Sequence, residues 1–431
     1  MFDPSWLLGH ARTTFTHATN TIPLNTKSGR KTTLSDLVRD VTPPCRLNPL
    51  LFNGHLQTMW TAVKEAGPAI YYKRRVFQST HAVYPGQFAV DFVVPVPKEG
   101  EVWEEDESLP ERTFYFSEEE FERIGSGDGK PMLVCLHGLS GGSHEVYLRH
   151  VVAPVTADGW ECCVVNARGC AMSKITTPQL FNARATWDVR QTVKWLRKTF
   201  PNRPLYAVGF SLGANILTNY CAEDGDKCEL KAAIACSNPW NLEVSHRGLL
   251  RSWLGMEVYQ RTMGSNIIKL YAQHKDEMLK NPKLKHEDIM ACRYLYEFDR
   301  VVQAPTWGYP TEGAYYRDAQ SVDALTAIRI PFLGISAEDD PISSVEAIPY
   351  EEFKQNPYAV LVTTNWGGHL SWFQIGGKRW FASAVEAFLL KMHNDIDSSV
   401  TPNVNGSANN TRPTSKYPIW DPNNRRLQLP L

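Results

Sequence analysis

Short apolar runs alternate with stretches of helical periodicity along most of the chain after residue 130. Runs of mostly apolar residues predict buried strands, and apolar residues that recur every three or four positions predict amphipathic helices. The predicted strands are 131–136, 161–166, 205–209, 231–236, 330–335 and 358–363. The predicted helices are 144–157, 182–199, 213–222 and 379–393. This alternation is typical of an α/β fold, in which helices cover both faces of a mostly parallel central sheet.

Two segments ahead of this region read as antiparallel strands, Tyr71–Gln78 and Gln87–Val94, with a Tyr-Pro-Gly turn between them. We expect this pair to extend one edge of the sheet. The next segment, 98–130, is acidic and irregular, and a charge run of this kind predicts a solvated surface insertion.

Composition narrows the class of protein. The chain has 431 residues, 43% of them hydrophobic, which is enough for one large core, and its formal charge of −1 gives no basic surface for nucleic acid. Nine cysteines show no C-x-x-C spacing, and several fall inside apolar runs, so we expect free thiols in a reducing compartment. The N-terminus does not read as a signal peptide, and no apolar stretch approaches the roughly 18 residues of a spanning helix. We therefore expect an intracellular, cytoplasmic protein.

The strand predicted at 205–209 enters a tight turn at 209–213, GFSLG, and then a helix. A strand, a G-x-S-x-G turn and a helix form a nucleophile elbow, which exposes a serine hydroxyl at the end of a sheet strand. The two glycines remove side chains that would clash where the turn passes the helix. We predict Ser211 as a nucleophile, although the bare pattern also occurs in ordinary strand-to-helix turns.

A second match, 138–142 (GLSGG), follows the strand predicted at 131–136, but no helix begins directly behind it. A strand that ends in His-Gly, as at His137, is typical of the loop that lends a backbone N–H to an oxyanion hole. We therefore assign 137–142 to that loop and predict the N–H groups of Leu139 and Leu212 as the oxyanion-hole donors.

A serine nucleophile needs a base and an acid that orients the base, and here the acid should precede the histidine in the chain. The segment after residue 330 reads GISAEDDPI, where we choose Asp340 because Pro-Ile follows it and keep Asp339 as the alternative. The segment after the last predicted strand reads TNWGGHL, which predicts His369 as the base. No metal-ligand spacing and no dinucleotide-binding loop occurs, so we expect neither a metal nor a cofactor.

Another histidine, His55, lies near the N-terminus in the sequence NGHLQT. It is a second candidate for a catalytic histidine. We favour the simpler interpretation that it fastens an N-terminal arm to the main domain.

The chain divides into four predicted parts. Residues 1–65 form an N-terminal arm with few strand signals, and 66–237 with 328–393 form the core. Between them, 238–327 reads as helices at 246–260, 266–280 and 286–299, rich in Leu, Met and aromatic residues. An insertion at that point predicts a lid whose apolar residues suit an acyl chain, although most of them will simply pack the helices. The polar tail, 394–431, is predicted to be disordered.

Six stretches together resemble one branch of the α/β-hydrolase superfamily. They read PCRLNPLLFNGHLQTMW, LVCLHGLSGGSHEVYLR, CCVVNARGCAMSK, LYAVGFSLGANILTNY, ISAEDDPIS and TTNWGGHLSWF, in that order. The branch holds bacterial YheT-like hydrolases, animal ABHD1/ABHD3-type lipid hydrolases and yeast medium-chain fatty acid ethyl ester synthase/esterases, and the chain resembles the fungal members most. The resemblance implies the α/β-hydrolase fold, with Ser211 as nucleophile, Asp340 as acid and His369 as base.

The resemblance also implies an activity. The fungal members move medium-chain acyl groups from acyl-CoA to an alcohol and hydrolyse the resulting ester. We therefore predict a serine esterase/acyltransferase that acts on medium-chain fatty acyl esters or acyl-CoA thioesters, with water or an alcohol as acceptor. Gln374 stands where some relatives carry the Asp of a His-x4-Asp acyltransferase signature, so any transfer must use the serine acyl-enzyme.

Other functions remain open at this point. The same residues suit a phospholipase, a monoacylglycerol lipase or a specialised biosynthetic acyltransferase. A non-catalytic lipid-binding protein of this fold is disfavoured, because all three catalytic candidates are present. Peripheral contact with lipid droplets or the endoplasmic reticulum is a further hypothesis, and we expect no nucleic-acid partner.

Overall fold

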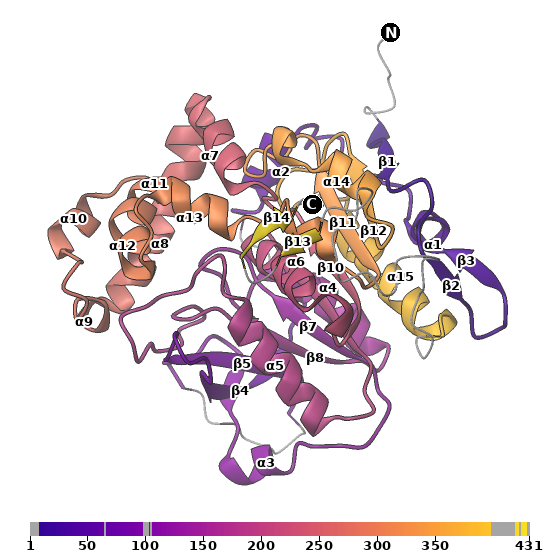
Figure 1. Cartoon of the computed structure of the whole chain (residues 1–431), viewed down its shortest axis with the longest axis horizontal. Helices are drawn as coiled ribbons and strands as arrows, with labels where there is room; N and C mark the ends of the chain where they lie inside the picture. The colour runs from indigo at the N-terminus through magenta and orange to yellow at the C-terminus, as the bar shows by residue number, and fades with distance from the viewer. Residues whose placement is uncertain are drawn as a thin grey trace.

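The computed structural model describes residues 8–63, 66–97, 103, 106–397, 419–421 and 424–428. A ten-stranded sheet with the order β1-β12-β11-β10-β9-β7-β8-β5-β4-β6 runs through the centre of the molecule (Figure 1). Its strands are β1 (Thr13–Thr16), β4 (Tyr71–Gln78), β5 (Gln87–Val94), β6 (Thr113–Tyr115), β7 (Met132–Leu136), β8 (Glu161–Asn166), β9 (Leu205–Phe210), β10 (Leu230–Cys236), β11 (Phe332–Ala337) and β12 (Ala359–Thr364).

The middle of the sheet is parallel from β8 through β7, β9, β10 and β11 to β12. Every residue of β7, β9, β11 and β12 is buried, because helices cover both faces, and this explains why the strands read as continuous apolar runs. β5 pairs antiparallel with β8, and β4 pairs antiparallel with β5. The predicted α/β-hydrolase architecture is confirmed.

Two hydrophobic cores lie on the two faces of the sheet. One face packs against α1 (Leu34–Val41), α4 (Val146–Ala157) and α15 (Trp380–Asp395). The other face packs against α5 (Thr186–Thr199), α6 (Leu212–Asp224) and α14 (Tyr350–Gln355). The four predicted core helices, α4, α5, α6 and α15, begin and end within a few residues of the predicted positions, whereas α1 and α14 were not predicted.

The edges of the sheet differ from the prediction. The N-terminal arm contributes β1, which pairs antiparallel with β12, and a hairpin of β2 (Pro23–Asn25) and β3 (Lys31–Thr33). The acidic insertion contributes β6, which pairs with β4, and α3 (Glu118–Glu122). These strands are short and partly exposed, so they carry no alternating apolar pattern, and neighbouring strands stabilise them.

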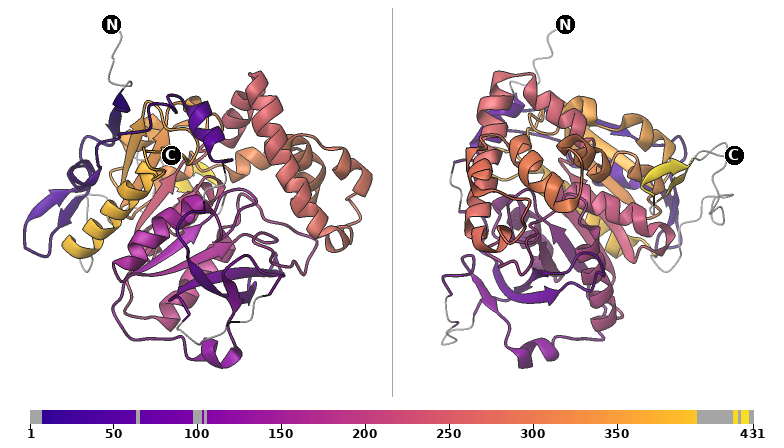
Figure 2. Two further views of the ribbon diagram at one scale, coloured as in Figure 1. Left: turned by 180° about the vertical axis from the view of Figure 1, so that it is seen from behind. Right: turned by 60° about the vertical axis from the view of Figure 1, so that its left-hand side comes forward.

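Residues 238–327 form a helical layer beside the sheet (Figures 1 and 2). Its helices are α7 (Leu242–Leu250), α8 (Arg261–Gln273), α9 (Lys275–Met278), α10 (His286–Ala291), α11 (Leu295–Phe298), α12 (Ala304–Trp307) and α13 (Glu312–Ala319), with two wide π-helical turns, η3 (Gly255–Gln260) and η4 (Asp299–Gln303). The sequence predicted longer uninterrupted helices here. The prediction ended one helix at residue 260 and another at 299, whereas the structure has the π turns η3 and η4 there and continues directly into α8 and α12.

The prediction that the tail is disordered is wrong for its described residues 419–421 and 424–428. Residues 398–418 lie outside the described part, but β13 (Ile419–Asp421) and β14 (Arg426–Gln428) form a hairpin. Trp420 is buried in the core, and Arg425 donates to Glu223 Oε1 at 2.6 Å. These long-range contacts order a segment whose own sequence has no periodicity.

All nine cysteines are free thiols, and eight of them are buried. Within the described ranges, none of the helices combines the length and the apolar character that crossing a membrane requires.

Candidate active site

The predicted catalytic residues come together at the carboxyl ends of neighbouring parallel strands. Ser211 follows β9, Asp340 follows β11, and His369 follows β12. Leu139 follows β7, the strand on the other side of β9. Loops beyond the carboxyl ends of a parallel sheet are where such folds place ligands.

The turn that carries Ser211 has the geometry of a nucleophile elbow. Ser211 has φ 52° and ψ −117°, an uncommon conformation for a non-glycine residue. A Cβ atom at Gly209 would lie 2.5 Å from the carbonyl oxygen of Gly213, and one at Gly213 would lie 2.3 Å from that of Leu136. Glycine at 209 therefore lets β9 and the turn approach α6, and glycine at 213 lets α6 approach the end of β7, this closely.

His369 lies between Ser211 and Asp340. Its Nε2 is 2.9 Å from Ser211 Oγ, and its Nδ1 is 2.7 Å from Asp340 Oδ2. A carboxylate only accepts hydrogen bonds, so Nδ1 carries the proton and Nε2 presents a lone pair to the serine hydroxyl. The other carboxylate oxygen of Asp340 accepts from the N–H groups of Ile342 and Ser343 at 2.8 and 2.9 Å, which fixes its orientation.

The alternative acid, Asp339, binds the backbone of the histidine loop, whereas the His369 ring pairs with Asp340. Its Oδ1 accepts from the N–H groups of Gly367 and Gly368 at 2.9 and 3.1 Å. Burial raises the pKa of Asp339 to about 6, and the neighbouring Asp340 charge adds to the rise. The two adjacent carboxylates therefore have different partners: Asp340 contacts the imidazole, and Asp339 contacts the backbone of the loop that carries it.

Both predicted oxyanion donors line the same cavity as Ser211. Leu212 is the first residue of α6, and the N–H groups of a helix's first turn have no acceptor within the helix. Among the described residues, the N–H of Leu139 has no acceptor, whereas that of Gly138 donates to Tyr147 Oη at 2.8 Å. The side chain of Tyr147 thus occupies one amide of the loop and leaves the next one available.

His137 fixes this loop to the neighbouring strand. Its Nε2 accepts from the N–H of Ala167 at 3.0 Å, so Nδ1 carries the proton and donates to the carbonyl of Gly138 at 2.6 Å. Burial lowers the pKa of His137 to about 4. His137 is therefore a neutral connector and not a second general base.

A buried ion pair supports the far end of the loop. Arg74 donates to both oxygens of Asp91, at 2.6 and 2.8 Å, and both side chains are fully buried. Ser143 Oγ and Asn166 Nδ2 also donate to Asp91, at 2.5 and 2.8 Å. Burial opposes ionisation of Asp91, but the Arg74 charge and these hydrogen bonds hold its pKa below the ordinary value.

Replacing Arg74 with methionine should lower the free energy of unfolding by about 3–5 kcal/mol, because Asp91 would be left buried without a counter-charge. Urea denaturation measures the loss. Arg75→Met is the matched control, because Arg75 pairs with Glu118, whose side chain is 76% exposed. That exposed pair should contribute about 1 kcal/mol or less. Equal losses in the two variants would contradict a specific role for the buried pair.

The N-terminal arm holds the histidine loop through α2 (Gly54–Trp60). Thr58 Oγ1 accepts from the N–H of His369 at 2.9 Å, and Gln57 Oε1 accepts from the N–H of Phe373 at 2.7 Å. Sequence reasoning missed these two residues. The NGHLQT motif singled out the segment, but no local signal connects it to a loop more than 300 positions away.

His55 does not join the predicted triad. Its Nδ1 lies 2.8 Å from Tyr259 Oη, and the two rings stack with their centroids 5.7 Å apart. Tyr259 belongs to η3, so His55 connects the arm to the helical layer of residues 238–327. His55 therefore fastens the arm to the helical layer, and not to the main domain as expected from the sequence.

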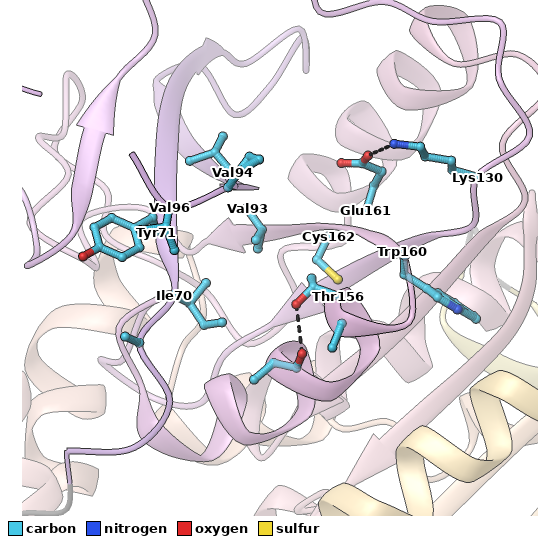
Figure 3. A pocket seen from close by; sticks show the side chains of 15 residues that line it. Ile70, Tyr71, Val93, Val94, Val96, Lys130, Thr156, Trp160, Glu161 and Cys162 are labelled. Atoms are coloured by element: carbon cyan, nitrogen blue, oxygen red, sulfur yellow. Dashed lines mark hydrogen bonds and ion pairs between the residues drawn. The ribbon is translucent and has the colours of Figure 1, made fainter. Parts of the chain in front are cut away.

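A cavity of about 110 Å³ opens beside Ser211, and its apolar wall includes Phe181, Leu242, Leu249 and Met263. A separate cavity of about 510 Å³ lies between α4 and the β4–β5–β8 edge of the sheet, among Ile70, Val93 and Trp160 (Figure 3). It contains none of the predicted site residues. Within the described ranges, no three His, Cys, Asp or Glu side chains are grouped so that they could hold a metal ion.

Comparisons with known proteins agree with this architecture. A model of the alpha/beta hydrolase fold family matches residues 131–373. The chain is 37% identical over 367 residues to a monoacylglycerol lipase of Saccharomyces cerevisiae, with 80% of each protein covered. It is 30% identical over 392 residues to medium-chain fatty acid ethyl ester synthase/esterase 2 of the same yeast, covering 80% of this chain and 85% of that one. Mouse phospholipase ABHD3 is 32% identical over 247 residues, 57% of this chain and 59% of its own.

The chain belongs to the α/β-hydrolase family, as its sequence motifs predicted. Within that family it is an enzyme of the serine hydrolase class.

Proposed function

We propose that the protein hydrolyses fatty acyl esters of lipids through an acyl-enzyme on Ser211. The observation that carries this proposal is the unbroken chain of hydrogen bonds from Ser211 Oγ through the imidazole of His369 to Asp340. The names of the yeast and mouse relatives, a lipase, an ester synthase/esterase and a phospholipase, support lipid esters as the substrate class.

The proposed reaction begins when His369 Nε2 takes the hydroxyl proton as Ser211 Oγ attacks the acyl carbonyl. The charge that develops on the carbonyl oxygen is stabilised by the N–H groups of Leu139 and Leu212, each contributing roughly 3 kcal/mol to the transition state. The imidazolium, held by Asp340, then gives its proton to the leaving alcohol, and the ester bond breaks. A water molecule attacks the acyl-serine by the same route, which releases the fatty acid and restores Ser211.

The second half of the reaction also permits acyl transfer. An alcohol in place of water would give a new ester, and an acyl-CoA thioester could supply the acyl group in the first half. The similarity to an ethyl ester synthase/esterase favours this as the second candidate activity. A medium-chain preference and contact with a lipid surface stay predictions.

The proposal can be tested by reaction with a fluorophosphonate, which modifies activated serines, followed by peptide mapping. We expect one adduct, on the peptide that contains Ser211, and its formation should slow in the presence of a monoacylglycerol or a fatty acid ethyl ester. An adduct on Ser140 would mean that the two G-x-S-x-G turns have exchanged roles. A folded protein that gives no adduct would contradict the acyl-enzyme mechanism.

A further inference from the structure

The cavity beside Ser211 has one polar corner. Most of its wall is apolar, but the helical layer also contributes polar side chains, and we use the name polar corner for five of them: Ser245, His246, Gln260, Asp299 and Tyr316. They come from α7, η3, η4 and α13, so four separate elements contribute polar side chains to this cavity. The triad and the oxyanion hole do not account for any of these groups.

Two of the polar atoms at this corner have no partner. Ser245 Oγ and Gln260 Oε1 are buried, and among the described residues neither has a hydrogen-bond partner. Gln260 Nε2 lies 3.4 Å from His246 Nδ1, so whichever way the amide is turned, one of its polar atoms stays unpaired. Each unpaired buried group costs about 1–3 kcal/mol, and such groups in a folded protein require an explanation.

The backbone that presents Gln260 and Asp299 is unusual in both cases. Gln260 is the last residue of the π turn η3, and Asp299 is the first residue of the π turn η4. A Cβ atom at Gly255, where η3 begins, would lie 1.9 Å from the carbonyl oxygen of Leu249, so this close approach requires glycine. π turns are rare and occur frequently at functional sites. Both of them here direct a polar residue to the same cavity.

The corner suits uncharged polar groups. Asp299 Oδ2 accepts from Tyr316 Oη at 2.6 Å, and burial raises the pKa of Asp299 to about 7. Burial also lowers the pKa of His246, which favours the neutral imidazole. Among the described residues that line the cavity there is no lysine or arginine to attract a phosphate. A ligand with hydroxyl groups could donate to Gln260 Oε1 and exchange hydrogen bonds with Ser245 Oγ without bringing a charge into a buried space.

We propose that Ser245 and Gln260 bind hydroxyl groups on the alcohol part of the substrate, so that esters of a polyhydric alcohol such as glycerol react faster than simple alkyl esters of the same fatty acid. This inference rests on the proposed lipid esterase function. An ordinary fatty acyl chain has only methylene groups to offer and would leave both atoms unpaired, whereas the free hydroxyls of a glycerol ester would pair with them.

The test compares kcat/KM for a 1-monoacylglycerol and for the ethyl ester of the same fatty acid in the parent protein, Gln260→Met and Ser245→Ala. Each variant should lose about tenfold toward the monoacylglycerol and stay within about twofold of the parent toward the ethyl ester, because only the first substrate uses the hydrogen bond. The ratio of the two kcat/KM values is therefore the decisive quantity, and it does not depend on the amount of active enzyme.

Gln303→Met is the matched control. Gln303 is also a buried glutamine in a π turn, but its Nε2 donates to the carbonyl of Phe181 at 3.1 Å and its Oε1 accepts from Trp307 Nε1 at 3.0 Å. It does not line the cavity. The control should lower the melting temperature, since it breaks one buried and one partly buried hydrogen bond, and leave the substrate ratio unchanged.

The outcomes separate this inference from the function on which it rests. An equal loss toward both substrates, or a ratio that does not move, would overturn the hydroxyl-binding role. A selective loss toward an ethyl ester whose acyl chain carries hydroxyls would place the bound hydroxyls on the acyl side and overturn it as well. Fluorophosphonate labelling of each variant reports on Ser211 independently: labelling with an unchanged ratio removes only the inference, and a parent that is not labelled removes the proposed function too.

Discussion

Ser211→Ala is expected to lower kcat for ester hydrolysis by about 10⁴-fold or more, with little change in the folded structure. The alanine has no oxygen to form the acyl-enzyme, and His369 cannot compensate because its Nε2 faces the missing hydroxyl. The oxyanion hole and the binding cavity would remain, so a residual rate above that of water alone should persist. Steady-state hydrolysis of a chromogenic fatty acyl ester, checked against the circular dichroism spectrum of the variant, measures the effect.

Ser140→Ala is the matched control, because Ser140 occupies the central position of the other G-x-S-x-G turn and also has a positive φ, 52°. Its loop is expected to act through the backbone N–H of Leu139, so removal of the Ser140 hydroxyl should leave most of the activity. A large loss in Ser140→Ala together with an active Ser211→Ala would reverse the assignment of the two turns.

The parts of this fold that could be predicted are those whose constraints are local. The elbow was recognisable because its steric demands fall on Gly209 and Gly213, within two residues of the serine. The parallel strands were recognisable because burial on both faces makes most of their positions apolar. In each case the signal lies in a few consecutive residues, even though the glycine at 213 also makes room for the distant carbonyl of Leu136.

The parts that could not be predicted depend on contacts between distant segments. β1 forms because β12 offers it an edge, and the hairpin at the C-terminus is held by Trp420 and Arg425 against the core. Thr58 supports His369 across 311 positions of sequence.

The choice between Asp339 and Asp340 was only partly predictable from the sequence. The Pro-Ile pair after Asp340 favoured that residue, but the loop geometry decides which carboxylate lies beside His369. Asp340→Asn is expected to lower kcat by about 10³–10⁴-fold. Asp340 Oδ1 accepts from two backbone N–H groups, so the amide oxygen of the asparagine would keep that position and its NH₂ group would face His369 Nδ1. The imidazole would then carry its proton on Nε2 and could no longer accept one from Ser211. The pH–rate profile and kcat of the variant test this directly.

Asp339→Asn should behave differently in both activity and stability. Its amide oxygen can still accept from Gly367 and Gly368, so we expect kcat to fall less than about tenfold.

Because burial raises the pKa of Asp339 from 3.8 to about 6, the folded state holds the proton more tightly than the unfolded state. The stabilisation is therefore complete below pH 3.8 and is lost as the pH rises through about 6, which leaves the parent up to roughly 3 kcal/mol less stable at neutral pH. The asparagine does not titrate, so the variant should be the more stable protein at pH 7 and show a flatter stability profile in urea denaturation between pH 4 and 7. If instead Asp339→Asn abolishes hydrolysis and Asp340→Asn is tolerated, the acid that orients His369 is the other carboxylate.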